Sequence, residues 1–177
     1  MQSLVGKVAL VTGGSKGIGR AICLRLARDG ATVVINYSND SSAANEVASI
    51  IGEKNATVIK ADAGNINEIS RLVDTTVEKH GKIDILVACT ATMKLNELEN
   101  VSGEEFDQTF DLNVKGPLFL TQVRRISNCC SCDFLMVLEI RSSYGTWFPH
   151  HTLLHNPMSR QHSSTTIPNI YNVERCH

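Results

Sequence analysis

Hydrophobic runs alternate with amphipathic segments over the first two thirds of the chain. Four short runs of aliphatic and β-branched residues have the length and composition of buried strands. Between them, apolar residues recur every three or four positions, which is the period of an amphipathic helix. Strands are predicted over residues 7–12, 32–36, 56–61 and 83–88, and helices over residues 17–30, 41–53, 65–81 and from 102 onward. This alternation predicts an α/β fold, a Rossmann-type doubly wound parallel sheet that is incomplete at the C-terminus.

Several helix boundaries carry their own sequence signals. Asn65 is followed three positions later by Glu68, and Ser102 is followed by Glu105 at the same spacing. This is the spacing of a capping box, in which the first residue caps the helix and the glutamate binds back to its N–H. Gly81 is predicted to end the helix that Asn65 begins. Phe106, Phe110 and Val114 are predicted to continue the last helix.

The chain changes character after Gln122. Residues 123–177 contain no Ala, no Lys and one Gly, but five of the six His, four of the six Cys and three of the four Pro. A strand over residues 134–140 is the only element that the pattern predicts there. The chain therefore divides into a Rossmann portion, residues 1–122, and a divergent tail, residues 123–177. Intron read-through or a frameshift is one hypothesis for the tail, and comparing transcript with genome tests it.

Composition narrows the class of partner. Hydrophobic residues make up 42% of the chain and charged residues 20%, which is typical of a soluble globular protein. The net charge of −1 gives no support for a nucleic acid or an anionic membrane as partner. No apolar run approaches the ~18 residues of a membrane span, and no signal peptide is predicted. We therefore expect a cytoplasmic protein with reduced thiols, in which Cys23 and Cys89 are small core hydrophobes.

A glycine-rich turn joins the first predicted strand to the first predicted helix. Residues 12–19 read Thr-Gly-Gly-Ser-Lys-Gly-Ile-Gly, in the strand–turn–helix context of a dinucleotide fingerprint. Gly13 permits the tight turn, Gly17 lets the backbone approach a pyrophosphate, and Gly19 allows close helix–strand packing. The free N–H groups at the helix start, that of Ile18 included, favour phosphate. The alternative is a glycine turn with a purely structural role.

The end of the second predicted strand decides which dinucleotide fits. An NAD site places an acidic residue there, about 20 residues beyond the fingerprint, to bind the ribose hydroxyls. Residues 36–39 read Asn-Tyr-Ser-Asn and contain no carboxylate, whereas amide and hydroxyl groups can donate to a 2′-phosphate. Lys16 is predicted to supply the positive charge, the alternative being a solvated surface lysine. The sequence therefore predicts NADP(H) as the cofactor.

Three further motifs accompany the glycine turn. They are Asp62 within Lys-Ala-Asp-Ala, residues 82–87 reading Lys-Ile-Asp-Ile-Leu-Val, and residues 111–117 reading Asp-Leu-Asn-Val-Lys-Gly-Pro. With the turn, these motifs resemble the short-chain dehydrogenase/reductase family, most of all its fungal polyketide and naphthol reductases, over residues 5–122. The resemblance implies NADP(H)-dependent reduction of a small-molecule ketone or oxidation of an alcohol. It also implies that Asp62 meets the adenine amino group, with a turn acid as the alternative, and that Asn113 belongs to the catalytic tetrad.

Pro117 lies four residues after Asn113 within a helical pattern. Proline has no N–H, so the helical hydrogen bond to the Asn113 carbonyl cannot form. The resemblance implies that the backbone of this asparagine anchors a water of the proton relay, and the freed carbonyl suits that role. A kink without a role is the alternative.

The chain departs from the family pattern in two places. Residues 88–91 read Ala-Cys-Thr-Ala where the family has Asn-Asn-Ala-Gly, whose amides tie the sheet to the cofactor side. The second departure concerns catalysis, because the family's Tyr-x-x-x-Lys pair is absent and the last lysine is Lys115. Tyr171 and Arg175 copy the spacing, but an always-charged planar guanidinium does not replace a proton-relay lysine. Ser143, next to Ser142, falls about where the family's catalytic serine is expected.

These observations leave three hypotheses. The first is an NADP(H)-dependent carbonyl reductase whose catalytic half is missing or altered, so that the chain as written is inactive. The second is a non-catalytic nucleotide-binding module. The third is a metal-binding tail built from Cys129, Cys132, His151 and His155, but the spacing is longer than that of zinc fingers and Cys130 intervenes, so no metal is predicted.

Family members usually pair through the helix that carries the tetrad asparagine and the helix after the catalytic tyrosine. Loss of the second helix predicts weakened assembly of the usual homo-oligomer and an exposed apolar face. The predicted cofactor-binding residues are Gly13, Ser15, Lys16, Gly17, Ile18, Gly19, Asn36, Tyr37, Ser38 and Asp62. The predicted catalytic residue is Asn113, with Ser143 and Tyr171 as further candidates.

Overall fold

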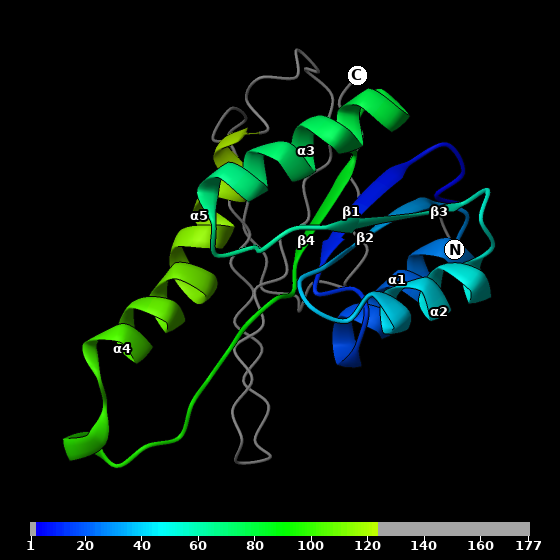
Figure 1. Ribbon diagram of the computed structural model, residues 1–177. Coiled ribbons are helices and arrows are strands. Elements are labelled where there is room, and N and C mark those ends of the chain that lie inside the picture. Colours follow the sequence, from blue (N-terminus) through cyan, green and yellow to red (C-terminus); the bar gives the residue numbers. More distant parts are fainter. Residues whose placement is uncertain (1–2, 124–177) are drawn as a thin grey trace, which may run out of the picture.

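The computed structural model describes residues 3–123 (Figure 1). Its four strands are β1 (Val8–Thr12), β2 (Thr32–Tyr37), β3 (Ala56–Lys60) and β4 (Ile85–Ala88). All neighbouring strands are parallel, in the order β3-β2-β1-β4. This is the strand order of a Rossmann sheet, in which the chain crosses from β3 to the far side of β1 to form β4. The predicted parallel sheet is confirmed over these strands, and the strand predicted over residues 134–140 lies outside the described residues.

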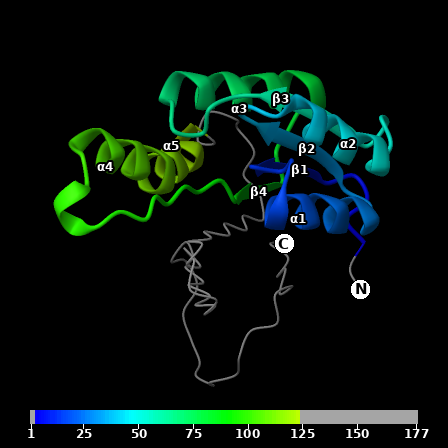
Figure 2. The same cartoon turned by 60° about the horizontal axis from the view of Figure 1, so that its bottom comes forward.

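Helices cover both faces of the sheet, as a doubly wound fold requires. The helical elements are α1 (Gly17–Arg28), α2 (Ser41–Ile51), α3 (Ile66–His80), a 3₁₀ turn (Leu98–Asn100), α4 (Gly103–Phe110), a π-helical turn (Asp111–Lys115) and α5 (Gly116–Val123). In Figure 2, α3 lies above the strands and α1 lies below them. No helix in the described part of the chain is long and apolar enough to cross a bilayer.

Alternation along β1 shows how the sheet feeds two cores. Ala9 and Val11 belong to the core under α1 and α2, which also contains Cys23. Val8 and Leu10 point to the opposite core, under α3 and α5. Each strand is therefore apolar on both faces, which explains why the sequence shows continuous apolar runs instead of a polar–apolar alternation.

The start of α3 differs in one detail from the predicted capping box. The side chain of Asn65 accepts from the N–H groups of Asn67 and Glu68, as expected of a cap. The Glu68 carboxylate, however, accepts the N–H of Asp62 at 2.8 Å, not that of Asn65. The reason is that the Asn65 N–H already donates to the Asp62 carbonyl. Gly81, with φ +78, ends the helix as predicted.

The second helix is shorter than predicted and presents a slightly different face. It ends at Ile51, two residues before the predicted end. Its buried residues are Ala44 and Val47, with Ala48 and Ile51 partly buried against the same core. The sequence pattern predicts that Val47, Ile50 and Ile51 share one face of this helix. Ile50 is instead exposed, because it is offset by one position from the i, i+3, i+4, i+7 stripe that begins at Ala44.

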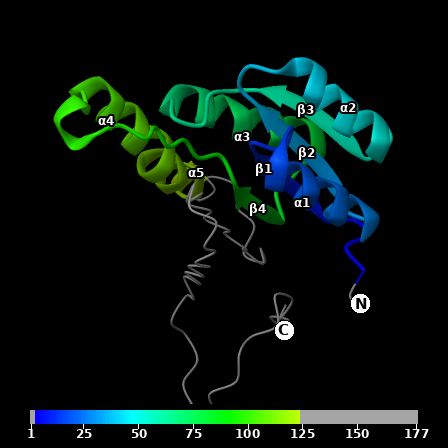
Figure 3. The ribbon, with the colours of Figure 1, turned by 90° about the horizontal axis from the view of Figure 1, so that it is seen from below.

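The chain leaves the sheet after β4 and returns through α4 and α5 (Figure 1). Figure 3 shows this helical arm beside the sheet and α3, with α4 at the end farther from β4. The helix predicted from Ser102 onward is interrupted by the π-helical turn, in which the Gly116 N–H donates to the carbonyl of Asp111, five residues back. The interruption lies directly before Pro117, which has no N–H for a regular helical bond.

Candidate functional site

The turn between β1 and α1 leaves no room for side chains at two of its glycines. Gly13 has φ +64, and a Cβ there would lie 2.9 Å from the Thr90 hydroxyl oxygen. A Cβ on Gly19 would collide with the carbonyl of Gly13. Gly17 has φ +55 and open space where a side chain would project. The turn is therefore tight where it meets the sheet and open where the sequence predicts an approaching pyrophosphate.

Gly14 is a further close-packed glycine, to which the sequence interpretation gave no role. A Cβ there would lie 2.8 Å from the Cys23 sulfur, and the Gly14 N–H donates to the carbonyl of Asn36. Burial raises the pKa of the Cys23 thiol to about 12. The thiol is thus neutral and packed in the core, as the sequence predicted.

The hydroxyl of Thr12 joins the ends of β1 and β4. It accepts the N–H groups of Cys89 and Thr90, at 3.1 and 3.3 Å, and donates to the Val87 carbonyl at 3.5 Å. This is where the chain departs from the family pattern, because the family's two asparagines are replaced by Ala88 and Cys89. In this chain, Thr12 ties the two strand ends together.

A pocket of about 250 Å³ lies where the carboxyl ends of the four strands meet the glycine turn. In an open parallel sheet, this edge beside the crossover is where ligands bind. The residues that line the pocket are Gly13, Ser15, Lys16, Asn36, Tyr37, Ser38, Asn39, Asp40, Ala61, Asp62, Ala63, Thr90 and Leu112. Most predicted cofactor residues thus meet in one cavity, while Gly17, Ile18 and Gly19 lie beside it in the first turn of α1.

The lining also contains residues that the sequence interpretation did not select. They are Asn39, Asp40, Ala61, Ala63, Thr90 and Leu112. All of them except Leu112 lie within three residues after a strand end, which is a signal that the sequence offered. Leu112 comes from the distant helical arm, and no local pattern connects it with the strands.

Asn36 is buried and already engaged with the protein. Its amide nitrogen donates to the Ala61 carbonyl at 2.9 Å, with longer contacts of 3.4 Å to the carbonyls of Tyr37 and Ile59. The side chain therefore ties the ends of β2 and β3. The amide hydrogens of Asn36 thus face main-chain carbonyls and not the pocket, whereas the neighbouring Ser38 is exposed.

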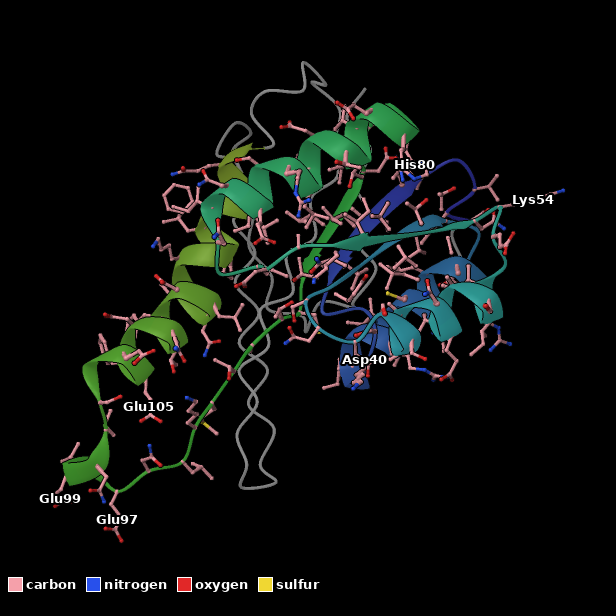
Figure 4. The ribbon with its side chains drawn as sticks, in the orientation of Figure 1. Asp40, Lys54, His80, Glu97, Glu99 and Glu105 are labelled. Carbon is pink, nitrogen blue, oxygen red and sulfur yellow. The ribbon has the colours of Figure 1, made fainter. Side chains whose placement is uncertain are left out.

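Lys16 forms an ion pair across the rim of the pocket. Its ammonium lies 2.6 Å from the carboxylate of Asp40, which also caps α2 by accepting the N–H of Ala43 at 3.0 Å. The hydrogen bond from Ala43 and, second, the contact with Lys16 hold the pKa of Asp40 below its ordinary value. Figure 4 labels Asp40 at the start of α2. Residues 36–39 contain no carboxylate, but Asp40, at the next position, carries one.

Asp62 lies in the turn after β3, on the pocket lining. One oxygen of its carboxylate accepts the N–H of Gly64 at 2.8 Å, which fixes the side chain in the turn. The residue is exposed, so the carboxylate is accessible from the pocket side.

Asn113 lies in the π-helical turn and clamps the segment after β4. Its side-chain oxygen accepts the N–H of Thr92 at 2.9 Å, and its side-chain nitrogen donates to the Thr92 carbonyl at 2.7 Å. A Cβ on the buried Gly116 would collide with the carbonyl of Ala63, so the turn packs directly on the loop after β3. Asn113 thus lies one residue from the pocket-lining Leu112. Ser143 and Tyr171 lie outside the described residues.

The pocket fits a dinucleotide on two observations. The Thr90 hydroxyl oxygen is a buried polar side-chain atom without a hydrogen-bond partner among the described residues, and it faces the glycine turn. Buried polar groups ordinarily have a partner, and a bound phosphate or ribose supplies acceptors and donors at such a place. The glycine turn adds backbone that ligand atoms can approach closely. The residues of the disfavoured metal-binding alternative, Cys129, Cys132, His151 and His155, lie outside the described residues.

The fold and this pocket define a Rossmann-type protein with a candidate dinucleotide site, and comparison identifies the family. The short chain dehydrogenase family model matches residues 7–125, and the chain belongs to this family. Among its relatives is versicolorin reductase 1 of Dothistroma septosporum, 42% identical over 122 residues, which are 67% of this chain and 46% of that protein. The tetrahydroxynaphthalene reductase of Pyricularia oryzae is 37% identical over 122 residues, 68% of this chain and 43% of that protein.

A solved structure agrees with these relatives. A short chain dehydrogenase of Burkholderia cenocepacia in complex with NADP superposes with a TM-score of 0.67 at 36% identity, over 69% of this chain and 51% of that one. The predicted resemblance to the family and to its fungal naphthol reductases is confirmed. The chain spans about half the length of the relatives that it matches.

Proposed function

We propose that the chain is the cofactor-binding part of an NADP(H)-dependent reductase of small-molecule ketones, and that the 177 residues bind the cofactor without turning it over. The observation that carries the proposal is the pocket itself. The glycine turn, the ends of β2 and β3 and the segment after β4 line one cavity at the carboxyl edge of a parallel sheet. Membership of the short-chain dehydrogenase family supports a nicotinamide dinucleotide as the ligand.

Each part of the pocket has a distinct task in this proposal. The N–H groups of the glycine turn and of the first turn of α1 bind the pyrophosphate at the positive end of the helix. Ser38 and Lys16 meet the adenosine ribose and its 2′-phosphate at the end of β2. Asp62 binds the adenine amino group, and the Thr90 hydroxyl donates to a ribose or phosphate oxygen. When bound, the cofactor supplies a hydride, and these residues hold and orient it.

The proposed lack of turnover rests on the proton that a reduced ketone needs. Hydride transfer leaves negative charge on the carbonyl oxygen, and a positioned acid that protonates this oxygen contributes about 10²–10⁴-fold to the rate. Asn113 is held by its two bonds to Thr92, but its amide is not an acid of suitable pKa. The sequence contains no Tyr-x-x-x-Lys and no lysine after Lys115, so the pair that the family uses for this proton is missing.

A non-catalytic nucleotide-binding module is the second candidate. The same pocket supports it, because the residues proposed to bind the dinucleotide lie within residues 13–112 and do not require the tail. The two candidates differ in whether a longer form of the protein carries the missing acid.

Calorimetric titration of the 177-residue chain with NADPH and with NADH tests the proposal. We expect one site, with NADPH bound more tightly than NADH. Equal affinities, or tighter binding of NADH, would refute the assignment of the 2′-phosphate to the end of β2. Failure to bind either dinucleotide at millimolar concentration would refute the cofactor-binding function itself.

A further inference from the structure

The ion pair between Lys16 and Asp40 joins the phosphate turn to the start of α2. One carboxylate oxygen of Asp40 accepts the Ala43 N–H, and the other lies 2.6 Å from the Lys16 ammonium. Both side chains line the pocket. Asp40 therefore has two tasks at once, because it caps a helix and fixes the position of a cation at the rim.

The charges on the pocket lining do not favour a phosphate as strongly as Lys16 alone suggests. Among the described residues that line the pocket, Lys16 carries the only positive charge, whereas Asp40 and Asp62 carry negative charges. Ala43 and Lys16 lower the pKa of Asp40, so its carboxylate is ionised at neutral pH. A dianionic phosphate at the end of β2 thus meets a cation that is already paired and a carboxylate that repels it.

We propose that Asp40 is a specificity-determining residue, which lowers the preference of the pocket for the 2′-phosphate of NADPH over the 2′-hydroxyl of NADH by holding Lys16 in an ion pair. The inference rests on the proposed function, because it assumes that a dinucleotide occupies this pocket. Asp40 lies two residues beyond Ser38 and contacts the Lys16 ammonium directly, so it acts on the phosphate mainly through Lys16.

The expected effect is moderate. The Lys16 side chain is 68% exposed and that of Asp40 is 41% exposed, so solvent and salt screen their interaction. Removing one charge at this distance in a largely aqueous setting changes an affinity by about five- to tenfold at low ionic strength. The effect falls as salt is added, which separates it from a change in shape.

The experiment measures the affinities of the 177-residue chain and its variants for NADPH, NADH, 2′,5′-ADP and 5′-AMP. Asp40→Asn keeps an oxygen that caps α2 but removes the charge. We expect it to tighten NADPH and 2′,5′-ADP about five- to tenfold and to leave NADH and 5′-AMP within about twofold. Asp40→Ser, another good helix cap, is expected to behave alike and guards against a folding artefact of either variant.

Glu46→Gln is the matched control. Glu46 is also on α2, its carboxylate forms an exposed ion pair with Arg20 at 3.4 Å, and it does not line the pocket. The control changes the net charge of the chain by the same amount and should leave the NADPH/NADH ratio unchanged. In a Lys16→Met background, Asp40→Asn should lose most of its effect, because the cation that it frees is gone.

The outcomes separate this inference from the proposed function. An unchanged NADPH/NADH ratio in Asp40→Asn, or an equal change in Glu46→Gln, overturns the inference while cofactor binding stands. If Asp40→Asn tightens NADPH binding as much in the Lys16→Met background as in the wild-type chain, the ion pair is not the cause of the effect. A wild-type chain that binds none of the four ligands overturns the proposed function and the inference with it.

Discussion

The glycine turn is closely packed against described residues, whereas the helical arm after β4 (α4 and α5) is packed only on part of its surface. At the turn, Gly13, Gly14 and Gly19 each pack against atoms that leave no space for a Cβ, and Thr12 fastens the turn to β4. On the arm, an apolar stripe is exposed over the described residues: Phe106, Phe110, Val114 and Leu118. All packing partners of the turn lie within the first 90 residues. The arm, in contrast, has apolar side chains that no described residue buries.

This difference in packing corresponds to a difference between cofactor binding and catalysis in the proposed function. The close-packed region is the one that binds a dinucleotide in the proposal, and its geometry depends on neighbours in sequence or in the sheet. Asn113, the predicted catalytic residue, lies on the arm and is positioned by a single main-chain segment at Thr92. Binding is therefore expected to be robust in this chain, and catalysis is expected to be absent.

The largest expected effect concerns turnover. We predict no detectable NADPH-dependent reduction of quinone or naphthol-type ketones by the 177-residue chain. A missing general acid costs about 10²–10⁴-fold, and poorer orientation of the nicotinamide falls on the same step. The assay is NADPH oxidation followed by absorbance. Robust turnover that Tyr171→Phe abolishes would contradict the account, because Tyr171 and Arg175 would then form a working pair.

The next largest effect tests the close packing of the turn and the arm. Gly19→Ala and Gly116→Ala each force a Cβ against a carbonyl, and such overpacking costs about 1–3 kcal/mol in the free energy of unfolding. Gly103→Ala is the matched control, since nothing lies within 4 Å of a Cβ there. Urea titration should find the control neutral or slightly stabilised. If all three variants unfold alike, the tight approach is not a feature of the protein in solution.

Gly19→Ala and Gly116→Ala should also separate in cofactor binding. Gly19 belongs to the turn beside the pocket, whereas Gly116 lies on the arm. We expect Gly19→Ala to weaken NADPH binding more than Gly116→Ala at a temperature where both are folded. The reverse order would mean that the arm, and not the turn, determines the shape of the dinucleotide site.

A smaller effect is expected at Asn113. Asn113→Ala removes both hydrogen bonds to Thr92, and we expect about 1–2 kcal/mol of destabilisation, since each such bond contributes about 1 kcal/mol. NADPH affinity should change little, because the side chain does not line the pocket. Urea unfolding and calorimetry measure the two quantities. If the variant kept its stability but lost NADPH binding, Asn113 would have to be assigned to cofactor binding and not to catalysis.

The smallest expected effect is a change of cofactor preference at the end of β2. Ser38→Asp places a carboxylate where the 2′-phosphate is proposed to lie, and one added charge at an exposed site changes the relative affinity about fivefold toward NADH. Asn55→Asp, at an exposed position before β3 and outside the pocket lining, serves as a control for added charge. Competition between NADPH and NADH measures the ratio of their affinities. An unchanged ratio in Ser38→Asp would show that the 2′-phosphate does not lie at this position.

Sequence alone gave most of the fold, because the apolar runs and helix stripes are local patterns and the right-handed crossover restricts how they assemble. The glycine turn was predictable for the same reason. The engagement of Asn36 with the Ala61 carbonyl was not, because it depends on the register of β2 and β3. Asp40 was missed because it is the helix cap, and nothing local indicates that a cap also reaches Lys16.

The arm was predicted less well than the sheet, again for a physical reason. Its apolar spacing is that of a regular helix, but Pro117 cannot donate and the backbone closes a π-helical turn instead. Phe106 and Phe110 are exposed on the arm. The predicted loss of the second pairing helix concerns residues outside the described range and stays a prediction. The division of the chain at Gln122 and the assembly state stay predictions.

Amide hydrogen exchange of the 177-residue chain with and without saturating NADPH tests the central claim most directly, because it locates the dinucleotide without requiring turnover. The account predicts added protection at residues 13–19, 36–40, 61–64 and 90–92, and little change along α4. Protection that spares the glycine turn, or none at concentrations where calorimetry finds the site filled, would contradict it.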